Sequence, residues 1–328
     1  MKDAFGRDID YLRLSVTDRC NLRCVYCLPV RAPAFLPAAS MLSDSEITEL
    51  VRCLALSGIS KIRITGGEPL VRPGLPGLVA ELGAVPGVRE LSLSTNGVLL
   101  ADHAAELKKA GLRRVNVSLD SLDAERFSRI TRFGELKAVL AGIEAALRGG
   151  LAPVKINVVV ARGFNEDEVS AFAELTVASP LHVRFIELMP MGAAEFFDRS
   201  RWVGQAEIME RAGPLEALSQ DQGPEGHGPA RYFRRPGARG TIGFISPLSC
   251  GFCSACNRLC LTAGGTLVPC LDGEDGADLR TPLRESAGRA RLLELIAETI
   301  RKKPEAHQMV ERAAAPGGAA RVMCQIGG

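Results

Sequence analysis

Short strand-like runs alternate with helix-like segments from residue 11 to about residue 190, and this alternation limits the fold more than any other feature of the sequence. The strand-like runs are rich in β-branched residues and cover 12–17, 61–65, 88–94, 113–119, 154–160 and 182–188. Helical periodicity follows several of them, at 43–57, 101–110 and 135–148. Connections of this length favour parallel strands joined by right-handed crossovers. The alternation therefore predicts an α/β fold, a partial (β/α)6 TIM-like barrel, because too few repeats precede residue 190 for a barrel of eight units.

The pattern changes near residue 200. Residues 212–240 are rich in Gly and Pro and have no sustained period, which indicates a linker or a structure dominated by loops. A cysteine-rich region and a helical pattern at about 285–302 follow. A chain of 328 residues is long enough for two cores. We therefore expect a barrel domain over residues 1–200 and a smaller C-terminal domain over residues 201–328.

Charge and hydropathy limit the possible partners. A net charge of +2 is too small for a general electrostatic footprint on nucleic acid, although a local basic pocket can still hold an anionic ligand. No stretch approaches the roughly 18 consecutive apolar residues of a membrane span, and the N-terminus has no hydrophobic signal core. We expect a cytoplasmic protein that binds neither nucleic acid nor a membrane. In that reducing compartment, clustered cysteines serve metals or catalysis more often than disulfides.

Three cysteines near the N-terminus, Cys20, Cys24 and Cys27, have the spacing C-x3-C-x2-C. This is not the paired C-x2-C of zinc fingers, and no histidine or carboxylate lies at ligand spacing nearby. Thiolates are soft ligands that favour iron–sulfur clusters or zinc. Three thiolates on a 4Fe-4S cluster leave one iron without a protein ligand, and an open coordination position indicates a centre that binds something.

The stretch "RITGGEPL" places Gly66, Gly67 and Glu68 at the end of the next predicted strand. Two glycines allow a ligand to come close to the backbone, and the Glu68 carboxylate could hold an ammonium group. This stretch and the three cysteines both follow strands, at the face where barrels of this type build active sites. The alternative is that "TGGEP" is an ordinary turn.

A second group of cysteines in "CGFCSACNRLCLTAGGTLVPC" contains two overlapping ligand patterns. Cys250, Cys253, Cys256 and Cys260 form C-x2-C-x2-C-x3-C, the bacterial ferredoxin run, which would close a cluster with four thiolates. Cys253, Cys256 and Cys270 form C-x2-C-x13-C, which would again leave one iron open. Spacing alone does not decide between them.

The first cysteine group, with Tyr26 before its third cysteine and "GGE" at the following strand end, resembles the radical S-adenosylmethionine enzymes. The resemblance implies that the amino and carboxylate groups of S-adenosylmethionine bind the open iron of a 4Fe-4S cluster. One electron from that cluster then cleaves a carbon–sulfur bond and releases a 5′-deoxyadenosyl radical. Such a radical requires a site that excludes water and competing C–H bonds.

Longer stretches extend the likeness over nearly the whole chain. The sequences "LRLSVTDRCN", "STNG", "VNVSLDSLD", "VKINVV", "RFIELMP" and a terminal "IGG" are similar to the GTP 3′,8-cyclase family, which performs the first step of molybdenum cofactor biosynthesis. This resemblance implies two 4Fe-4S clusters, S-adenosylmethionine as cofactor, and GTP as substrate, converted to 3′,8-cyclo-7,8-dihydro-GTP. It also implies a reductant protein such as flavodoxin or ferredoxin, a cyclic pyranopterin monophosphate synthase downstream, and a homodimer.

The resemblance also assigns expected roles to single residues. The first cluster is held by Cys20, Cys24 and Cys27, and the second, whose open iron meets the guanine, by Cys253, Cys256 and Cys270. The cofactor-binding positions, with the "GGE" residues included, are Tyr26, Gly66, Gly67, Glu68, Ser118 and Met189. The GTP-binding positions are Arg13, Arg63, Ser94, Lys155 and Arg258. The terminal Gly327 and Gly328 are expected to enter the active site and support catalysis, because residues without side chains can thread a crowded pocket.

One position departs from the family. The family usually has "NRLR" after Cys256, with both arginines facing the substrate, whereas this chain has "NRLC" with Cys260. A thiol cannot donate a charge-assisted bidentate hydrogen bond, so at Cys260 one phosphate or guanine contact is missing, or a basic residue elsewhere supplies it. We expect Cys270 rather than Cys260 to be the cluster ligand. The alternatives are another radical S-adenosylmethionine enzyme with an auxiliary cluster, or a non-catalytic iron–sulfur or zinc-binding protein.

Overall fold

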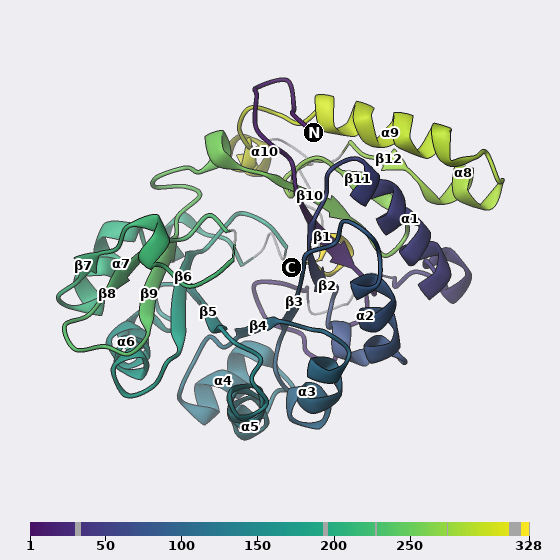
Figure 1. Cartoon of the computed structure of the whole chain (residues 1–328). Helices are drawn as coiled ribbons and strands as arrows, with labels where there is room; N and C mark the ends of the chain where they lie inside the picture. Colours follow the sequence, from purple (N-terminus) through teal and green to yellow (C-terminus); the bar gives the residue numbers. More distant parts are fainter. Residues whose placement is uncertain (30–33, 193–195, 227, 274, 315–322, 328) are drawn as a thin grey trace.

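Figure 1 shows a computed structural model of the chain, which describes residues 1–29, 34–192, 196–226, 228–273, 275–314 and 323–327. All six predicted strands are confirmed, with ends within two residues of those expected. They are β1 (Tyr11–Ser15), β2 (Lys61–Thr65), β3 (Glu90–Thr95), β4 (Arg114–Ser118), β5 (Val154–Val160) and β6 (His182–Glu187). They lie parallel and in sequence order. The α/β class and the TIM-like curvature follow from this order, with helices outside the strands (Figure 1).

The helices between these strands cover the outer face of the sheet (Figure 1). They are α1 (Asp44–Leu56), α2 (Leu75–Gly83), α3 (Leu100–Lys109), α4 (Ala124–Thr131), α5 (Leu136–Arg148) and α6 (Val169–Ala178). The first begins at a capping box, in which the Ser43 hydroxyl accepts from the Glu46 N–H and the Glu46 carboxylate accepts from the Ser43 N–H. This cap explains why the helix predicted over residues 43–57 starts where it does.

The two faces of the strands differ sharply in polarity. Residues such as Leu12, Ile64 and Val117 face the helices and belong to the main apolar core. The alternate positions on the same strands are polar or charged and face the inside of the barrel, among them Arg13, Ser92 and Asn116. Strands of a parallel sheet are ordinarily apolar on both faces. A polar inner face therefore favours contact with polar groups over an apolar core.

The residues after 200 extend the same sheet at both edges. At one edge, β9 (Thr241–Ile245) lies parallel to β6 and is followed by β8 (Arg231–Arg234) and β7 (Glu216–Ala217). At the other edge, β10 (Arg258–Leu261) lies parallel to β1 and is followed by β11 (Thr266–Val268) and β12 (Ala277–Asp278). Two of these short strands, β7 and β8, lie in the stretch 212–240, which was expected to be a linker or dominated by loops. The domain boundary at residue 200 stays a prediction.

The remaining helices are α7 (Gln205–Ala212), α8 (Arg280–Arg284), α9 (Arg289–Arg301), α10 (Met309–Ala314) and α11 (Met323–Ile326). The helix predicted at about 285–302 is confirmed as α9, which packs against α1 (Figure 1). None of the helices in the described residues is long and apolar enough to cross a membrane.

Candidate active site

The first cysteine group, Cys20, Cys24 and Cys27, lies in the loop after β1, at the C-terminal ends of the parallel strands. The loop turns tightly, because the N–H groups of Cys27 and Leu28 both donate to the carbonyl of Cys24, at 2.9 and 3.0 Å. All three side chains are free thiols. Burial raises the pKa of each thiol, and for Cys24 the negative charges of Cys27 and Asp120 raise the pKa further.

The three thiols are soft donors of the type that iron–sulfur clusters take. Within the described part of the chain, no three His, Cys, Asp or Glu side chains lie close enough to share one metal ion. A 4Fe-4S cluster makes a different demand, because each thiolate binds a different iron. Bound iron would also compensate the cost of placing three thiolates among acidic neighbours.

The "GGE" loop packs against the loop that carries the first cysteines. Gly67 and Glu68 donate backbone hydrogen bonds to the carbonyls of Thr17 and Arg19, both at 2.8 Å. A Cβ on Gly66 would lie 2.5 Å from the Thr17 carbonyl oxygen, and one on Gly67 would lie 2.3 Å from that of Arg19. The glycines are therefore required for a close approach of protein backbone, in addition to any approach of a ligand.

Glu68 links the ends of two strands. Its buried carboxylate accepts hydrogen bonds from the N–H groups of Leu70 and Asn96, at 3.0 and 2.7 Å, and from the Thr95 hydroxyl, at 2.8 Å. Burial raises the pKa of Glu68 to about 7 despite these bonds. The carboxylate expected to hold an ammonium group thus already fixes the loops after β2 and β3.

Tyr26 and Asp120 join the first cysteine loop to the ends of β4 and β5. The Tyr26 hydroxyl donates to Asp120 Oδ2 at 2.6 Å, and the Val159 N–H donates to Asp120 Oδ1 at 2.8 Å. Burial raises the pKa of Asp120 to about 6. Asp120 was not among the expected site residues, although it lies two residues after Ser118, the expected cofactor-binding position at the end of β4.

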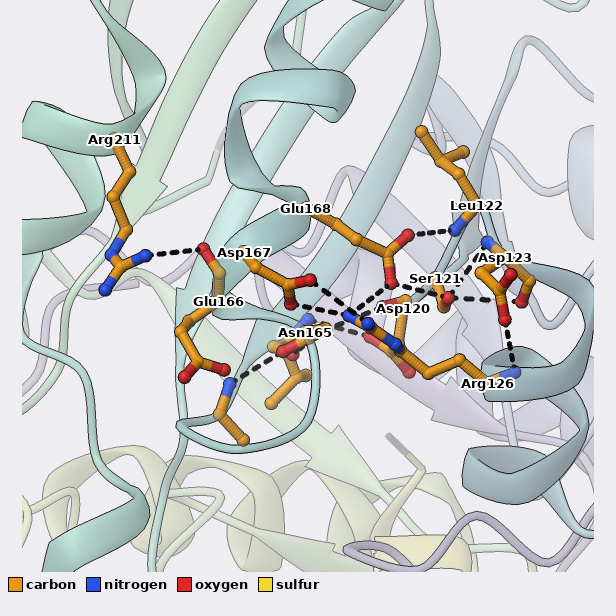
Figure 2. Close-up of polar contacts among 12 residues, drawn as sticks. Asp120, Ser121, Leu122, Asp123, Arg126, Asn165, Glu166, Asp167, Glu168 and Arg211 are labelled. Atoms are coloured by element: carbon orange, nitrogen blue, oxygen red, sulfur yellow. Dashed lines mark hydrogen bonds and ion pairs between the residues drawn. The ribbon is translucent and has the colours of Figure 1, made fainter.

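A polar network fixes the loop that contains Asp120 (Figure 2). The Asn165 amide nitrogen donates to the Asp120 carbonyl at 2.7 Å. The Glu168 carboxylate accepts from the Ser121 hydroxyl at 2.7 Å and from the Leu122 N–H at 2.6 Å. The β5–α6 connection therefore holds the loop after β4 in place, and with it the partner of Tyr26.

Cations converge inside the barrel. Arg114, Lys155 and Arg184 are fully buried there, and Arg13 and Arg63 are register neighbours on β1 and β2. Four N–H groups of this set are buried without an acceptor in the described residues: Nε of Arg13, of Arg63 and of Arg114, and Nη1 of Arg114. Burial, reinforced by neighbouring cations, lowers the pKa of Arg63 to about 9 and that of Lys155 to about 5. Such a set favours an anionic ligand.

Two of these arginines were missed by the sequence analysis. Arg184 donates to Asn157 Oδ1 at 2.8 Å and to Asn116 Oδ1 at 2.7 Å, and Arg114 pairs with Glu90. The signal was present as polar residues at alternate positions, Arg114, Asn116 and Ser118 in "RVNVS" and His182 and Arg184 in "HVRFIE". The predicted Ser94 lies in register beside Asn116, and Ser118 beside Asn157, so both belong to this polar interior.

The second cysteine group lies at the opposite end of the barrel. Cys253 and Cys256 precede β10, whose first residue is paired with Tyr11 at the start of β1, and Cys270 follows β11. Burial alone would raise the pKa of Cys256, but the positive charges of Arg258 and Lys303 outweigh it and lower the pKa to about 7. The pKa of Cys270 is raised by burial. The guanidinium of Arg258 lies over the Phe252 ring, 5.0 Å from its centroid.

Comparison with known proteins identifies the family. Residues 14–176 match the Radical SAM superfamily model, and residues 181–309 match the model for Molybdenum Cofactor Synthesis C. The chain is 51% identical to the GTP 3′,8-cyclase of Pelotomaculum thermopropionicum and 48% identical to that of Heliobacterium modesticaldum, over the whole length of both chains in each case. The chain belongs to the GTP 3′,8-cyclase family.

A solved structure supports the fold alone. The Streptococcus suis protein SuiB, crystallised with S-adenosylmethionine, superposes with a TM-score of 0.62 at 12% identity, over 97% of this chain and 77% of SuiB. The partial TIM-like barrel of this GTP 3′,8-cyclase family member therefore agrees with a fold observed by experiment.

Cys260, where the resemblance led us to expect an arginine, is buried on β10 in register with Arg13. It belongs to an apolar cluster that contains Met191, Val268 and Ile326, with Met189 packed against it. Cys250, the other extra cysteine of the ferredoxin-like run, is exposed.

The C-terminal tail enters the barrel. Arg13 Nη2 donates to the Gly327 carbonyl at 2.6 Å, and Cys324 and Ile326 of α11 are buried. Gly327 has φ +88°, and a Cβ there would lie 2.6 Å from Thr65 Cγ2, so only glycine fits this place. Gly328 lies outside the described residues.

Proposed function

We propose that this chain converts GTP to 3′,8-cyclo-7,8-dihydro-GTP in the first step of molybdenum cofactor biosynthesis. The observation that carries the proposal is the barrel interior, between the two cysteine groups, where N–H groups of buried arginines have no acceptor among the residues that the structure describes. A triphosphate supplies the acceptor oxygens and negative charge that such an interior lacks. The family to which the chain belongs is named for GTP as substrate.

Each cysteine group holds one 4Fe-4S cluster in this proposal. Cys20, Cys24 and Cys27 bind the first cluster, and Cys253, Cys256 and Cys270 bind the second. When bound, the first cluster and S-adenosylmethionine supply the 5′-deoxyadenosyl radical that removes the 3′ hydrogen of GTP. Two features support Cys270 as the third ligand of the second group: Cys260 packs in an apolar cluster on β10, and Cys250 is exposed.

The protein positions both ligands around the radical. Tyr26, Gly66, Gly67, Glu68, Ser118 and Met189 form the S-adenosylmethionine site at the C-terminal ends of the strands. Arg13, Arg63, Ser94 and Lys155 hold GTP inside the barrel, with Arg258 and Cys260 at the side of the second cluster. Holding the ribose next to the radical carbon makes the hydrogen transfer effectively unimolecular, which lowers its entropic cost.

The tail excludes water from this site. Gly327 lies against Ser15 and Thr65, and α11 is packed into the apolar cluster around Cys260. A site covered by the tail keeps the radical from other C–H bonds. Gly327 and Gly328 support catalysis in this way, by completing the pocket that positions the substrate.

The remaining partners follow from the reaction. A reductant protein such as flavodoxin or ferredoxin supplies the electron for the first cluster, and a cyclic pyranopterin monophosphate synthase uses the product. We propose a cytoplasmic homodimer, with the barrel in residues 1–200 and the second cluster and part of the GTP site in residues 201–328.

The role of the interior cations is tested by nucleotide binding. Arg63→Met should weaken GTP binding at least about tenfold, since a hydrogen bond to a charged group contributes about 1.5–3 kcal/mol, and should leave guanosine binding unchanged. Arg129→Met, at an arginine whose side chain is 67% exposed on α4, is the matched control. Equal weakening of GTP and guanosine by Arg63→Met would contradict the assignment of Arg63 to the triphosphate.

A further inference from the structure

One buried lysine connects the two segments that carry the second cysteine group. Lys303 lies two residues after the end of α9 and is 3% exposed. Its Nζ donates to the Arg258 carbonyl at 2.8 Å and to the Pro269 carbonyl at 2.7 Å. Arg258 follows Cys256 by two residues, and Pro269 directly precedes Cys270. A single ammonium group thus bridges the long sequence gap between these two cysteines.

Arg7 makes the corresponding connection for Cys253. Its Nη1 donates to the Cys253 carbonyl at 2.7 Å and to the Glu305 carbonyl at 2.9 Å, and its Nη2 donates to the Pro304 carbonyl at 2.6 Å. Residues 303–305 and the N-terminal segment therefore enclose the group from outside the barrel. Each of the three cysteines lies at, or within two residues of, a carbonyl bound by a buried cation.

The two cations differ in how their charges are balanced. The Nε of Arg7 pairs with Asp3 Oδ2 at 2.6 Å, so its charge is compensated. Lys303 forms no ion pair in the described part of the chain, and its acceptors named above are neutral carbonyls. Its charge instead favours the thiolate forms of Cys256, Cys260 and Cys270.

We propose that Lys303 is a positioning residue of the second cluster site, which fixes the separation of Cys256 and Cys270 and supplies an uncompensated positive charge that raises the reduction potential of the cluster bound there. Arg7 acts only on geometry, because Asp3 neutralises it. The proposal rests on the proposed function, since it requires a cluster on Cys253, Cys256 and Cys270. Reduction adds an electron to that cluster, and a nearby positive charge stabilises the reduced form.

The test uses the full chain with Cys20, Cys24 and Cys27 replaced by alanine, so that only the second site can hold a cluster. Lys303→Met should shift the reduction equilibrium about tenfold toward the oxidised cluster, which is about 59 mV for one electron, measured by a redox titration followed by electron paramagnetic resonance. Lys303→Arg should keep the potential of the parent protein. Arg7→Met should lower the iron content and leave the potential of the remaining cluster unchanged.

Lys302→Met is the matched control, because Lys302 is the exposed neighbour of Lys303 and has the same charge. It should change neither iron content nor potential. An unchanged potential in Lys303→Met overturns the electrostatic part of the proposal. If Lys303→Met binds no iron, the reduction potential is measured in Lys303→Gln instead, because glutamine keeps an N–H donor without the charge.

Hydrogen exchange of the cluster-free proteins tests the geometric part separately. Residues 253–270 should exchange faster in Lys303→Met than in Lys302→Met, because the link between their carbonyls is lost. Equal exchange in the two variants overturns the positioning role. A parent protein that binds no cluster would instead contradict the proposed function, and the exchange comparison would still decide the role of Lys303.

Discussion

The two cysteine groups occupy opposite ends of one barrel and have opposite electrostatic surroundings. In the first group, burial and the negative neighbours Cys27 and Asp120 raise the pKa of Cys24 well above its usual value. In the second, Arg258 and Lys303 lower the pKa of Cys256 to about 7 in spite of burial. Three thiols alone therefore do not define a site. The first group needs the positive charge of bound iron to become thiolate, whereas the second is already supplied with cations.

The groups also differ in what holds them in place. The first group lies in one short loop, fixed by its own turn and by the bond between Tyr26 and Asp120. The second group is assembled from segments around residues 253–258 and 269–270, linked through Lys303 and Arg7. The positions of the first three cysteines therefore depend on one loop, whereas those of the second group depend on residues that are distant in the sequence.

The largest expected effect separates the two groups by function. Cys24→Ala should abolish formation of 5′-deoxyadenosine, because the proposed radical source is bound only by the first group. The product is measured by chromatography after anaerobic incubation with a reductant, S-adenosylmethionine and GTP. Cys250→Ser, at an exposed cysteine, is the control and should retain activity. Persistent 5′-deoxyadenosine in Cys24→Ala would mean that the roles of the two groups are assigned wrongly.

The contrast in thiol pKa predicts different reactivity in cluster-free protein. At pH 7.5, iodoacetamide should modify Cys256 at least about tenfold faster than Cys24, since the thiolate is the reactive form and a lowered pKa increases its fraction. Mass spectrometry of the digested protein gives both rates from one sample. Raising the pH should narrow the difference, because Cys24 then also loses its proton. Equal modification rates of Cys256 and Cys24 at pH 7.5 would contradict the difference in thiol pKa between the two groups.

Iron content distinguishes the two ligand patterns of the second group. The wild-type chain should bind about eight irons in two 4Fe-4S clusters, and Cys270→Ser should bind about four. Cys260→Ser is the matched variant and should keep about eight irons, because Cys260 packs in the apolar cluster with Met191 and Ile326. The reverse result, with iron lost only from Cys260→Ser, would show that Cys260 and not Cys270 is a cluster ligand. The second cluster would then be bound by four thiolates, as in the ferredoxin-like pattern.

The smallest expected effect concerns the loop of the first group. Tyr26→Phe removes the hydrogen bond to buried Asp120 and should lower the free energy of unfolding by about 1–3 kcal/mol, measured by urea denaturation. Asp120→Asn keeps an acceptor oxygen and should lower the stability less. A Tyr26→Phe variant as stable as the wild type would show that this bond does not fix the loop.

Sequence patterns predicted the barrel well because its strands and helices are encoded locally. The runs "KIRIT" and "VKINVVV" coincide with β2 and β5, and the spacing of the first cysteines lies within one loop. Other features depend on contacts between distant segments. Lys303 lies in "RKKPEAH" beside exposed Lys302, and nothing in that sequence distinguishes the buried lysine from its neighbour.

Arg114 and Arg184 are an intermediate case. Their positions alternate with apolar residues, which identifies the inner face of each strand, but only the pairing of β4, β5 and β6 in the sheet brings them together with Lys155. Asp120 is similar, because its partner Tyr26 is distant in the sequence. Periodicity therefore predicts which face of the sheet a side chain is on, and the fold determines which residues it contacts there.

The most direct test of the account is an anaerobic incubation of the reduced protein with S-adenosylmethionine, with and without GTP. The account predicts that GTP stimulates formation of 5′-deoxyadenosine and is itself converted to 3′,8-cyclo-7,8-dihydro-GTP, identified by mass spectrometry. Formation of 5′-deoxyadenosine at the same rate without GTP, and no new nucleotide product, would contradict it.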